Sequence, residues 1–137
     1  LYHCGPVMVA DGTGGWRMVA GGPTTSSREE PYEADVIAKF GLRVIIGKGG
    51  MGPKTIAACR EYGCVYLQAV GGAGALIAAA VERVEGVDFL QDFGPAEAMW
   101  HLRVRGLPVT VAIDAHGNSL YDQVAATSAT RLHELLA

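Results

Sequence analysis

The sequence is short of charged residues, of cysteine and of long apolar runs, and each shortage excludes a class of protein. Only 18% of the 137 residues are charged and the net charge is −3, so a surface that neutralises nucleic-acid phosphates is not expected. No apolar run approaches the roughly 20 residues that span a bilayer, which excludes a membrane-spanning segment. Half of the residues are hydrophobic, which excludes disorder, and the length predicts one domain over residues 1–137.

The three cysteines, Cys4, Cys59 and Cys64, form an odd number without the close spacing of a metal-binding motif. Cys59 and Cys64 are predicted to be buried free thiols in a reducing cytosol, with a zinc or cluster site as the alternative. We therefore expect a cytoplasmic protein in which any metal centre comes from another chain. The chain starts at Leu1 with neither Met nor a signal-peptide pattern, so a natural N-terminal segment is expected to be missing.

Glycine, by contrast, is abundant, with 19 residues concentrated in loops. Three glycine loops each follow a run with a strand pattern and precede a run with a helical pattern. The loops lie at residues 21–23, 47–50 and 71–74, the expected strands at 16–20, 42–46 and 65–70, and the expected helices at 31–40, 53–62 and 75–84. This repetition predicts a parallel sheet with crossover helices, in which the apolar run at 42–46 is buried on both faces.

The last third of the chain has patterns typical of antiparallel strands. The expected elements are strands at 98–104, 108–113 and 119–123, a hairpin turn at 114–118, and a final helix at 128–136. Asp114 is expected to brace the turn. Together with a first strand at 1–10, these elements predict an α/β domain with a mixed parallel and antiparallel sheet and crossover helices on the outside.

Four residues with hydroxyl side chains, Thr24 to Ser27, follow Gly22-Pro23 and precede Arg28. Lys48 lies on the second glycine loop. Backbone amides in such strand-to-helix loops favour an anion. The planar guanidinium of Arg28 can donate two parallel hydrogen bonds to an anion, and Lys48 offers a compact positive charge. A dicarboxylate and a phosphate are therefore equally suitable ligands. The hydroxyls could also cap the following helix. We expect one of the four to do so and another to face a site for a small anionic substrate.

An ordered set of short motifs runs through nearly the whole chain. They are Gly5-Pro6, Gly22-Pro23-Thr24-Thr25, Ile46-Gly47-Lys48-Gly49, Gly71-Gly72-Ala73, Phe93-Gly94-Pro95, Leu107-Pro108-Val109 and Ile113-Asp114-Ala115-His116-Gly117-Asn118. In this order they resemble the β-subunit, or C-terminal domain, of class I iron–sulfur fumarate hydratases. The β-subunits of L-tartrate dehydratases share the scaffold and most of the motifs.

The resemblance implies a swivelling β/β/α domain and a hydro-lyase of the tricarboxylic acid cycle that reversibly hydrates fumarate to L-malate. It also implies an α-subunit partner whose three cysteines hold a [4Fe–4S] cluster, in a heterotetramer. By motif position, Thr24 corresponds to the threonine that exchanges a proton with the substrate carbon. Arg28 and Lys48 correspond to the carboxylate-binding cations, and Thr25 is a further substrate-binding residue. Neighbouring cations and a dry site would favour the alkoxide that a threonine base requires.

The sequence departs from the family pattern in two places. The family motif continues Arg-Met-Asp, whereas here Arg28 is followed by Glu29 and Glu30. The charge of both acids suits the N-terminus of the following helix. An inward-facing Glu29 would weaken anion binding, and we expect Glu29 to lie at a solvated helix start instead. The family also carries a substrate-binding arginine segment before the first Gly-Pro, so a missing N-terminal arm is expected, and the isolated chain is expected to be inactive.

Three other functions remain open from the sequence. The first is an L-tartrate dehydratase β-subunit, which differs in substrate but not in family. The second is a non-catalytic module in which Arg28 and Lys48 only sense an anion. The third is a self-sufficient phosphate-binding enzyme, which is disfavoured because the glycine loops lack the ending of a nucleotide-binding P-loop.

Overall fold

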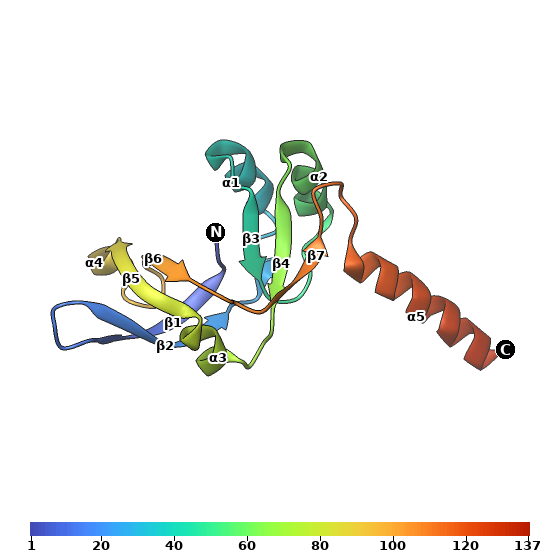
Figure 1. Ribbon diagram of the computed structural model, residues 1–137. Helices are drawn as coiled ribbons and strands as arrows, with labels where there is room; N and C mark the ends of the chain where they lie inside the picture. Colours follow the sequence, from blue (N-terminus) through green and yellow to red (C-terminus); the bar gives the residue numbers. More distant parts are fainter.

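The computed structural model describes all residues from 1 to 137, Pro23 by its backbone alone. Figure 1 shows a helix-covered sheet, a layer of strand hairpins beside it, and a long C-terminal helix that projects away from both. In chain order the elements are β1 (Cys4–Ala10), β2 (Trp16–Pro23), a 3₁₀ helix (Ser26–Arg28), α1 (Glu33–Phe40), β3 (Val44–Gly47), α2 (Pro53–Tyr62), β4 (Val65–Ala69), α3 (Gly74–Ala79), β5 (Val81–Asp88), α4 (Leu90–Phe93), β6 (Met99–Val104), β7 (Val109–Ile113) and α5 (Leu120–Leu136). The predicted mixed α/β class is confirmed, with three small sheets.

The helix-covered sheet has the strand order β3-β4-β7. β3 and β4 run parallel, and β7 runs antiparallel to β4. α1 and α2 pack with this sheet around one hydrophobic core, which consists of Ile37, Ile45, Met51, Ala58, Cys59, Cys64, Tyr66, Ala112 and Ile113. The burial of Cys59 and Cys64 in this core is as predicted. Because β3 and β4 are parallel, the loops that follow them emerge at the same edge of the sheet.

Local sequence signals set the ends of the two helices on this sheet. α2 spans Pro53–Tyr62 as predicted, since Pro53 occupies the first helical turn and Gly63 adopts the left-handed conformation with φ 65°. α1 ends likewise at Gly41, with φ 61°. It begins at Glu33 rather than at residue 31, because residues 30–32 form a turn after the 3₁₀ helix.

The second layer consists of two antiparallel hairpins, β1-β2 and β5-β6. α3 packs on the first hairpin, where the side chain of Ile77 lies so close to Gly21 that a Cβ there would be 2.6 Å from an Ile77 methyl group. The rings of Trp16 and Trp100 meet edge to face at 5.3 Å and join the two hairpins. This layer lies beside the helix-covered sheet in Figure 1.

The predicted parallel sheet with three repeated units is wrong for the first unit, and the third unit has a shorter helix than predicted. β2 pairs antiparallel with β1, so only β3 and β4 form a parallel pair. The helix expected at 75–84 ends at Ala79, and β5 begins at Val81. Val81, Val84 and Val87 are β-branched residues among charged ones, and pairing with β6 overrides the helical propensity of the alanine run before them.

The end of the chain also differs from its prediction. The turn is confirmed, because Asp114 Oδ1 accepts hydrogen bonds from the amides of His116 and Asn118, both at 2.9 Å. The strand expected at 119–123 is wrong, because Ser119 caps α5 by accepting a hydrogen bond from the Asp122 amide at 3.2 Å. α5 is 17 residues long, and no helix in the described chain has the length and apolar character to cross a membrane.

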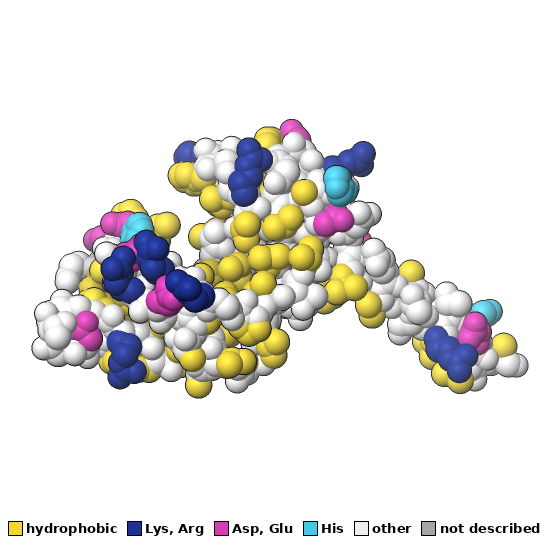
Figure 2. All heavy atoms as spheres, in the orientation of Figure 1, with side chains coloured by type: hydrophobic (Ala, Val, Ile, Leu, Met, Phe, Trp, Pro, Cys, Tyr) yellow, Lys and Arg dark blue, Asp and Glu magenta, His cyan; other side chains and the backbone are white. Residues whose placement is uncertain are grey.

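The sheet is covered by helices on one face, and the expectation that the run at 42–46 is buried on both faces is therefore wrong. Val44 in β3 is 39% exposed and Val111 in β7 is 54% exposed. Figure 2 shows hydrophobic side chains gathered across the centre of the molecule, with charged side chains toward its periphery.

The end of β3 is too crowded for any residue except glycine at position 47. A Cβ on Gly47 would overlap the buried hydroxyl of Ser26 and would lie 2.6 Å from the hydroxyl of Tyr66. Ser26 and Tyr66 are both fully buried. Neither group can therefore move into solvent to make room.

We predict that Gly47→Ala lowers the free energy of unfolding by about 2 kcal/mol, the usual effect of overpacking a rigid core. Chemical denaturation monitored by circular dichroism measures this change. Gly5→Ala is the matched control, because a Cβ on Gly5 meets no atom within 4 Å. Equal stability of the two variants would show that the region around Ser26 is loosely packed.

Candidate anion-binding site

The segment from Thr24 to Ser26 is held at both ends by hydrogen bonds to distant parts of the chain. The Thr24 amide donates to the carbonyl of His3 at 2.8 Å. The Lys48 amide donates to the hydroxyl of Ser26 at 2.8 Å. Between and beside these anchors the side chains of Thr24 and Thr25 are exposed. The two threonines are thus fixed through the backbone while their hydroxyls face solvent.

The four hydroxyls do not share one role. Thr25 precedes the 3₁₀ helix but makes no side-chain capping bond, and α1 is preceded by Tyr32, so the expected hydroxyl cap of the following helix is not formed. Ser26 is the structural member, because it is buried and bonds to the second glycine loop. This leaves Thr24, Thr25 and Ser27 as the exposed residues whose hydroxyls are free to meet a ligand.

The three glycine loops lie near one another, although they do not end three strands of one parallel sheet. Gly47 lies against Ser26 in the first loop region. A Cβ on Gly71 would lie 3.0 Å from the Lys48 side chain, so the aliphatic stem of Lys48 runs beside the third loop. A Cβ on Gly74 would lie 3.7 Å from the carbonyl of Gly21. The structure therefore brings the Thr24 segment and Lys48 together.

Arg28 and Lys48 are the two cations of this region. Arg28 is exposed at the end of the 3₁₀ helix, and Lys48 is half-buried after β3. Among the described residues neither side chain takes part in an ion pair. The Arg28 guanidinium forms no hydrogen bond or ion pair with Lys48 or with the threonine hydroxyls in the described chain. Both cations are therefore without a charged partner.

Glu30 caps a helix, but not the one that follows it in the sequence. Its carboxylate accepts hydrogen bonds from the amides of Gly52 at 2.7 Å and Lys54 at 2.9 Å, and from the hydroxyl of Thr55 at 2.6 Å. These donors belong to the first turn of α2, where a negative charge is favoured. The expectation that Glu30 serves the N-terminus of the helix that follows it is therefore wrong. Glu30 instead ties the Arg28 segment to the loop that carries Lys48.

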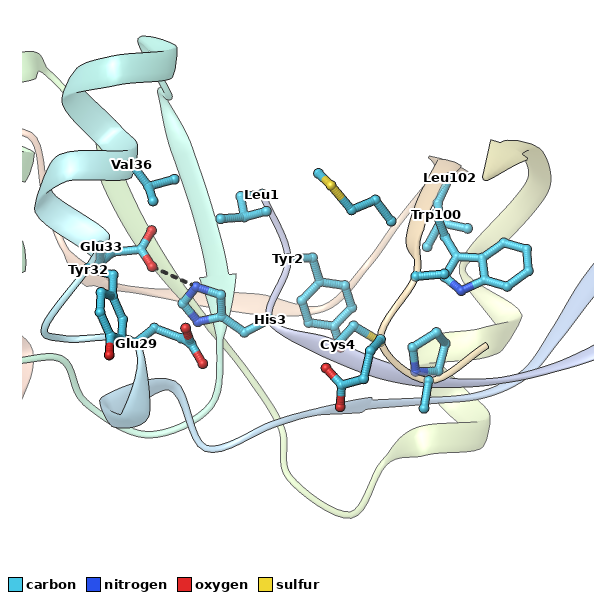
Figure 3. A pocket seen from close by; sticks show the side chains of 15 residues that line it. Leu1, Tyr2, His3, Cys4, Glu29, Tyr32, Glu33, Val36, Trp100 and Leu102 are labelled. Carbon is cyan, nitrogen blue, oxygen red and sulfur yellow. Dashed lines mark hydrogen bonds and ion pairs between the residues drawn. The ribbon is translucent and has the colours of Figure 1, made fainter. Parts of the chain in front are cut away.

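Glu29 is less solvated than expected. It is half-buried and lines a cavity of about 450 Å³ together with His3 and Glu33. Figure 3 shows this cavity between α1 and the start of the chain on one side and β6 on the other. Glu29 forms none of the ion pairs of the described chain, with Arg28 or otherwise.

His3 and Glu33 form a buried pair that no sequence motif predicts. His3 Nε2 lies 2.9 Å from Glu33 Oε2, and the two side chains are 5% and 2% exposed. The burial of Glu33, though not that of His3, could have been predicted from helical spacing. Glu33 precedes the core residue Ile37 by one helical turn, so both must lie on the buried face of α1.

The cysteines of this chain are poor metal ligands in their present environments. Burial raises the pKa of Cys59 to about 12 and that of Cys4 to about 11, and it also raises the pKa of Cys64. Metals bind the thiolate, which these environments disfavour. Across the described chain, no group of three or more His, Cys, Asp or Glu side chains is arranged to hold a metal ion.

Comparison with known proteins decides the family. The family model described as Fumarase C-terminus matches residues 1–124. The chain belongs to this family. One relative, from Geobacillus stearothermophilus, is named a putative class I fumarate hydratase. It is 53% identical to this chain over 98% of this chain and 26% of the relative. The resemblance inferred from the ordered motifs is confirmed.

Two further family members are named as β-subunits of L(+)-tartrate dehydratase. The protein from Methanocaldococcus jannaschii is 42% identical over 99% of this chain and 70% of the relative. The protein from Escherichia coli K12 is 38% identical over 88% of this chain and 59% of the relative. The chain thus spans 26% of the fumarate hydratase relative and 59% to 70% of these β-subunits.

We predict that Glu30→Ala lowers the free energy of unfolding by about 2 kcal/mol, because several donors at the start of α2 lose a charged acceptor. Thermal and chemical denaturation measure the loss. Glu29→Ala is the control and is expected to stay within about 0.5 kcal/mol, as for substitutions outside bonded networks. A larger loss for Glu29 than for Glu30 would contradict the capping role.

Proposed function

We propose that this chain is the β-subunit, or β-type domain, of an iron–sulfur hydro-lyase that reversibly hydrates fumarate to L-malate in the cytoplasmic tricarboxylic acid cycle. The observation that carries the proposal is the fixed placement of the Thr24 segment beside the loop of Lys48, with two unpaired cations and the exposed residues Thr24 and Thr25. Membership of the Fumarase C-terminus family supports it. The exposure of the threonines supports an active site completed by a partner.

In this proposal Thr24 exchanges a proton with the substrate carbon. A threonine hydroxyl is a weak base in water, so the positive charges of Arg28 and Lys48 must favour its alkoxide once a partner excludes solvent. The same cations bind the substrate carboxylates, and Thr25 donates a further hydrogen bond to the substrate. Arg28 and Lys48 also stabilise the negative charge that builds on a substrate carboxylate as the carbon–hydrogen bond breaks.

The proposed cofactor is a [4Fe–4S] cluster held by an α-subunit in a heterotetramer. The raised pKa of each cysteine here supports this division, since a neutral thiol is a poor cluster ligand. When bound in the α-subunit, the cluster would supply a Lewis acid for the substrate hydroxyl. The residues of this chain would hold the carboxylates and move the proton on the other side of the substrate.

L-tartrate is the second candidate substrate, because two of the relatives are named as tartrate dehydratase β-subunits. Both substrates are four-carbon dicarboxylates and would use the same two cations. The test is an anaerobic assay of the complete enzyme with its cluster-bearing partner on L-malate and on L-tartrate. Faster turnover of L-malate supports the proposal, faster turnover of tartrate reverses the order, and turnover of neither refutes a hydro-lyase.

We predict that Thr24→Ala lowers kcat by about 10²- to 10⁴-fold, the range for loss of a positioned acid–base group. KM and association with the partner are expected to change little, because Arg28 and Lys48 still bind the carboxylates. Thr13→Ala is the control, since Thr13 lies in the β1-β2 turn, at the far end of the hairpin in Figure 1. Steady-state kinetics on the complete enzyme measure both variants. Unchanged kcat in Thr24→Ala would remove Thr24 from the proton transfer.

A further inference from the structure

The peptide unit of His3 lies between the end of β3 and the Thr24 segment. The His3 amide donates to the carbonyl of Ile46 at 2.8 Å, and the His3 carbonyl accepts from the Thr24 amide at 2.8 Å. Ile46 is two residues before Lys48 in the same strand and loop. The position of Thr24 relative to Lys48 therefore depends on where His3 sits.

The side chain of His3 is locked in place by Glu33. Its Nε2 lies 2.9 Å from Glu33 Oε2, and both side chains are almost fully buried. Figure 3 shows His3 pointing toward α1, from which Glu33 reaches back to the imidazole. Because Glu33 shares the buried face of α1 with the core residue Ile37, its own position is set by the core.

Neither side chain has a second protein partner among the described residues. His3 Nδ1 and Glu33 Oε1 are buried and accept or donate no hydrogen bond. The bond between the two residues is thus the only polar link that each side chain makes within the described chain. Removal of one partner leaves the other buried and unpaired, which is costly enough to displace it.

We propose that His3 and Glu33 are positioning residues that hold Thr24 in a fixed position relative to Lys48. The link runs from the core through Glu33 to the imidazole of His3, and from the His3 carbonyl to the Thr24 amide. Both side chains are almost fully buried, and His3 reaches the Thr24 segment through its backbone carbonyl rather than through its imidazole. The catalytic consequence rests on the proposed function, while the structural link from Glu33 to Thr24 does not.

The first test is kinetic and uses the complete enzyme. Glu33→Leu is expected to lower kcat about 100-fold, the effect of a displacement of about 1 Å at a reacting group, with KM changed less than about 3-fold. Glu33→Gln can still pair with neutral His3 and is expected to restore most of kcat. When Thr24 is already alanine, Glu33→Leu is expected to add little to the loss, because the residues act as a unit.

The matched control is the other histidine–carboxylate pair of the chain. His101 Nε2 lies 2.7 Å from Asp88 Oδ2, with side chains 58% and 59% exposed on the β5-β6 hairpin. His101→Gln is expected to leave kcat unchanged. An equal loss of kcat in His101→Gln and Glu33→Leu would overturn the inference, because it would show a general loss of structure.

The second readout is amide hydrogen exchange, which needs no turnover. Exchange of the Thr24 amide, measured on peptides that span residues 22–27, is expected to rise at least about 10-fold in Glu33→Leu and in His3→Gln and to stay unchanged in His101→Gln. His3→Gln serves if Glu33→Leu does not fold. Unchanged exchange in the folded variants overturns the inference. A wild-type enzyme without turnover on malate or tartrate refutes the proposed function instead, and exchange still decides the inference.

Discussion

The hydrogen bond from the Lys48 amide to the buried hydroxyl of Ser26 joins two segments 22 residues apart, and the candidate site depends on it. It forms only because Gly47 has no side chain to fill the space between Ser26 and Tyr66. The hydroxyl of Tyr66 continues the connection by donating to the carbonyl of Gly49 at 2.9 Å. The chain therefore uses buried hydroxyls to fix the loops and leaves exposed hydroxyls for a ligand.

The acidic residues of this region fit the same division between support and site. Glu30 is bonded to the amides of α2 and Glu33 to the imidazole of His3, so neither forms an ion pair with Arg28 or Lys48. The two cations are consequently without an ion-pair partner in the described chain, although the whole chain has a net charge of −3. Unpaired cations suit a dianionic ligand.

Local chemistry made part of the fold predictable from the sequence. The ends of α2 were correct because Pro53 and Gly63 act on their own helix. The predicted helix at 75–84 extends into the start of β5, because the pairing of β5 with β6 is non-local and cannot be read from the alanine run that precedes Val81. In the site, the ordered motifs predicted that Thr24 and Lys48 belong to one site. The hydrogen-bond partners of Ser26, Glu30 and His3 lie 22 to 30 residues away in the sequence and leave no local pattern.

The central claim is that Thr24, Arg28 and Lys48 belong to one anion site. A structure of the complete enzyme with a bound four-carbon dicarboxylate tests it most directly. The account predicts carboxylate oxygens about 3 Å from the Arg28 guanidinium and the Lys48 ammonium, with the Thr24 hydroxyl facing a substrate carbon. A dicarboxylate bound in the catalytic centre without contact to these three residues would contradict it.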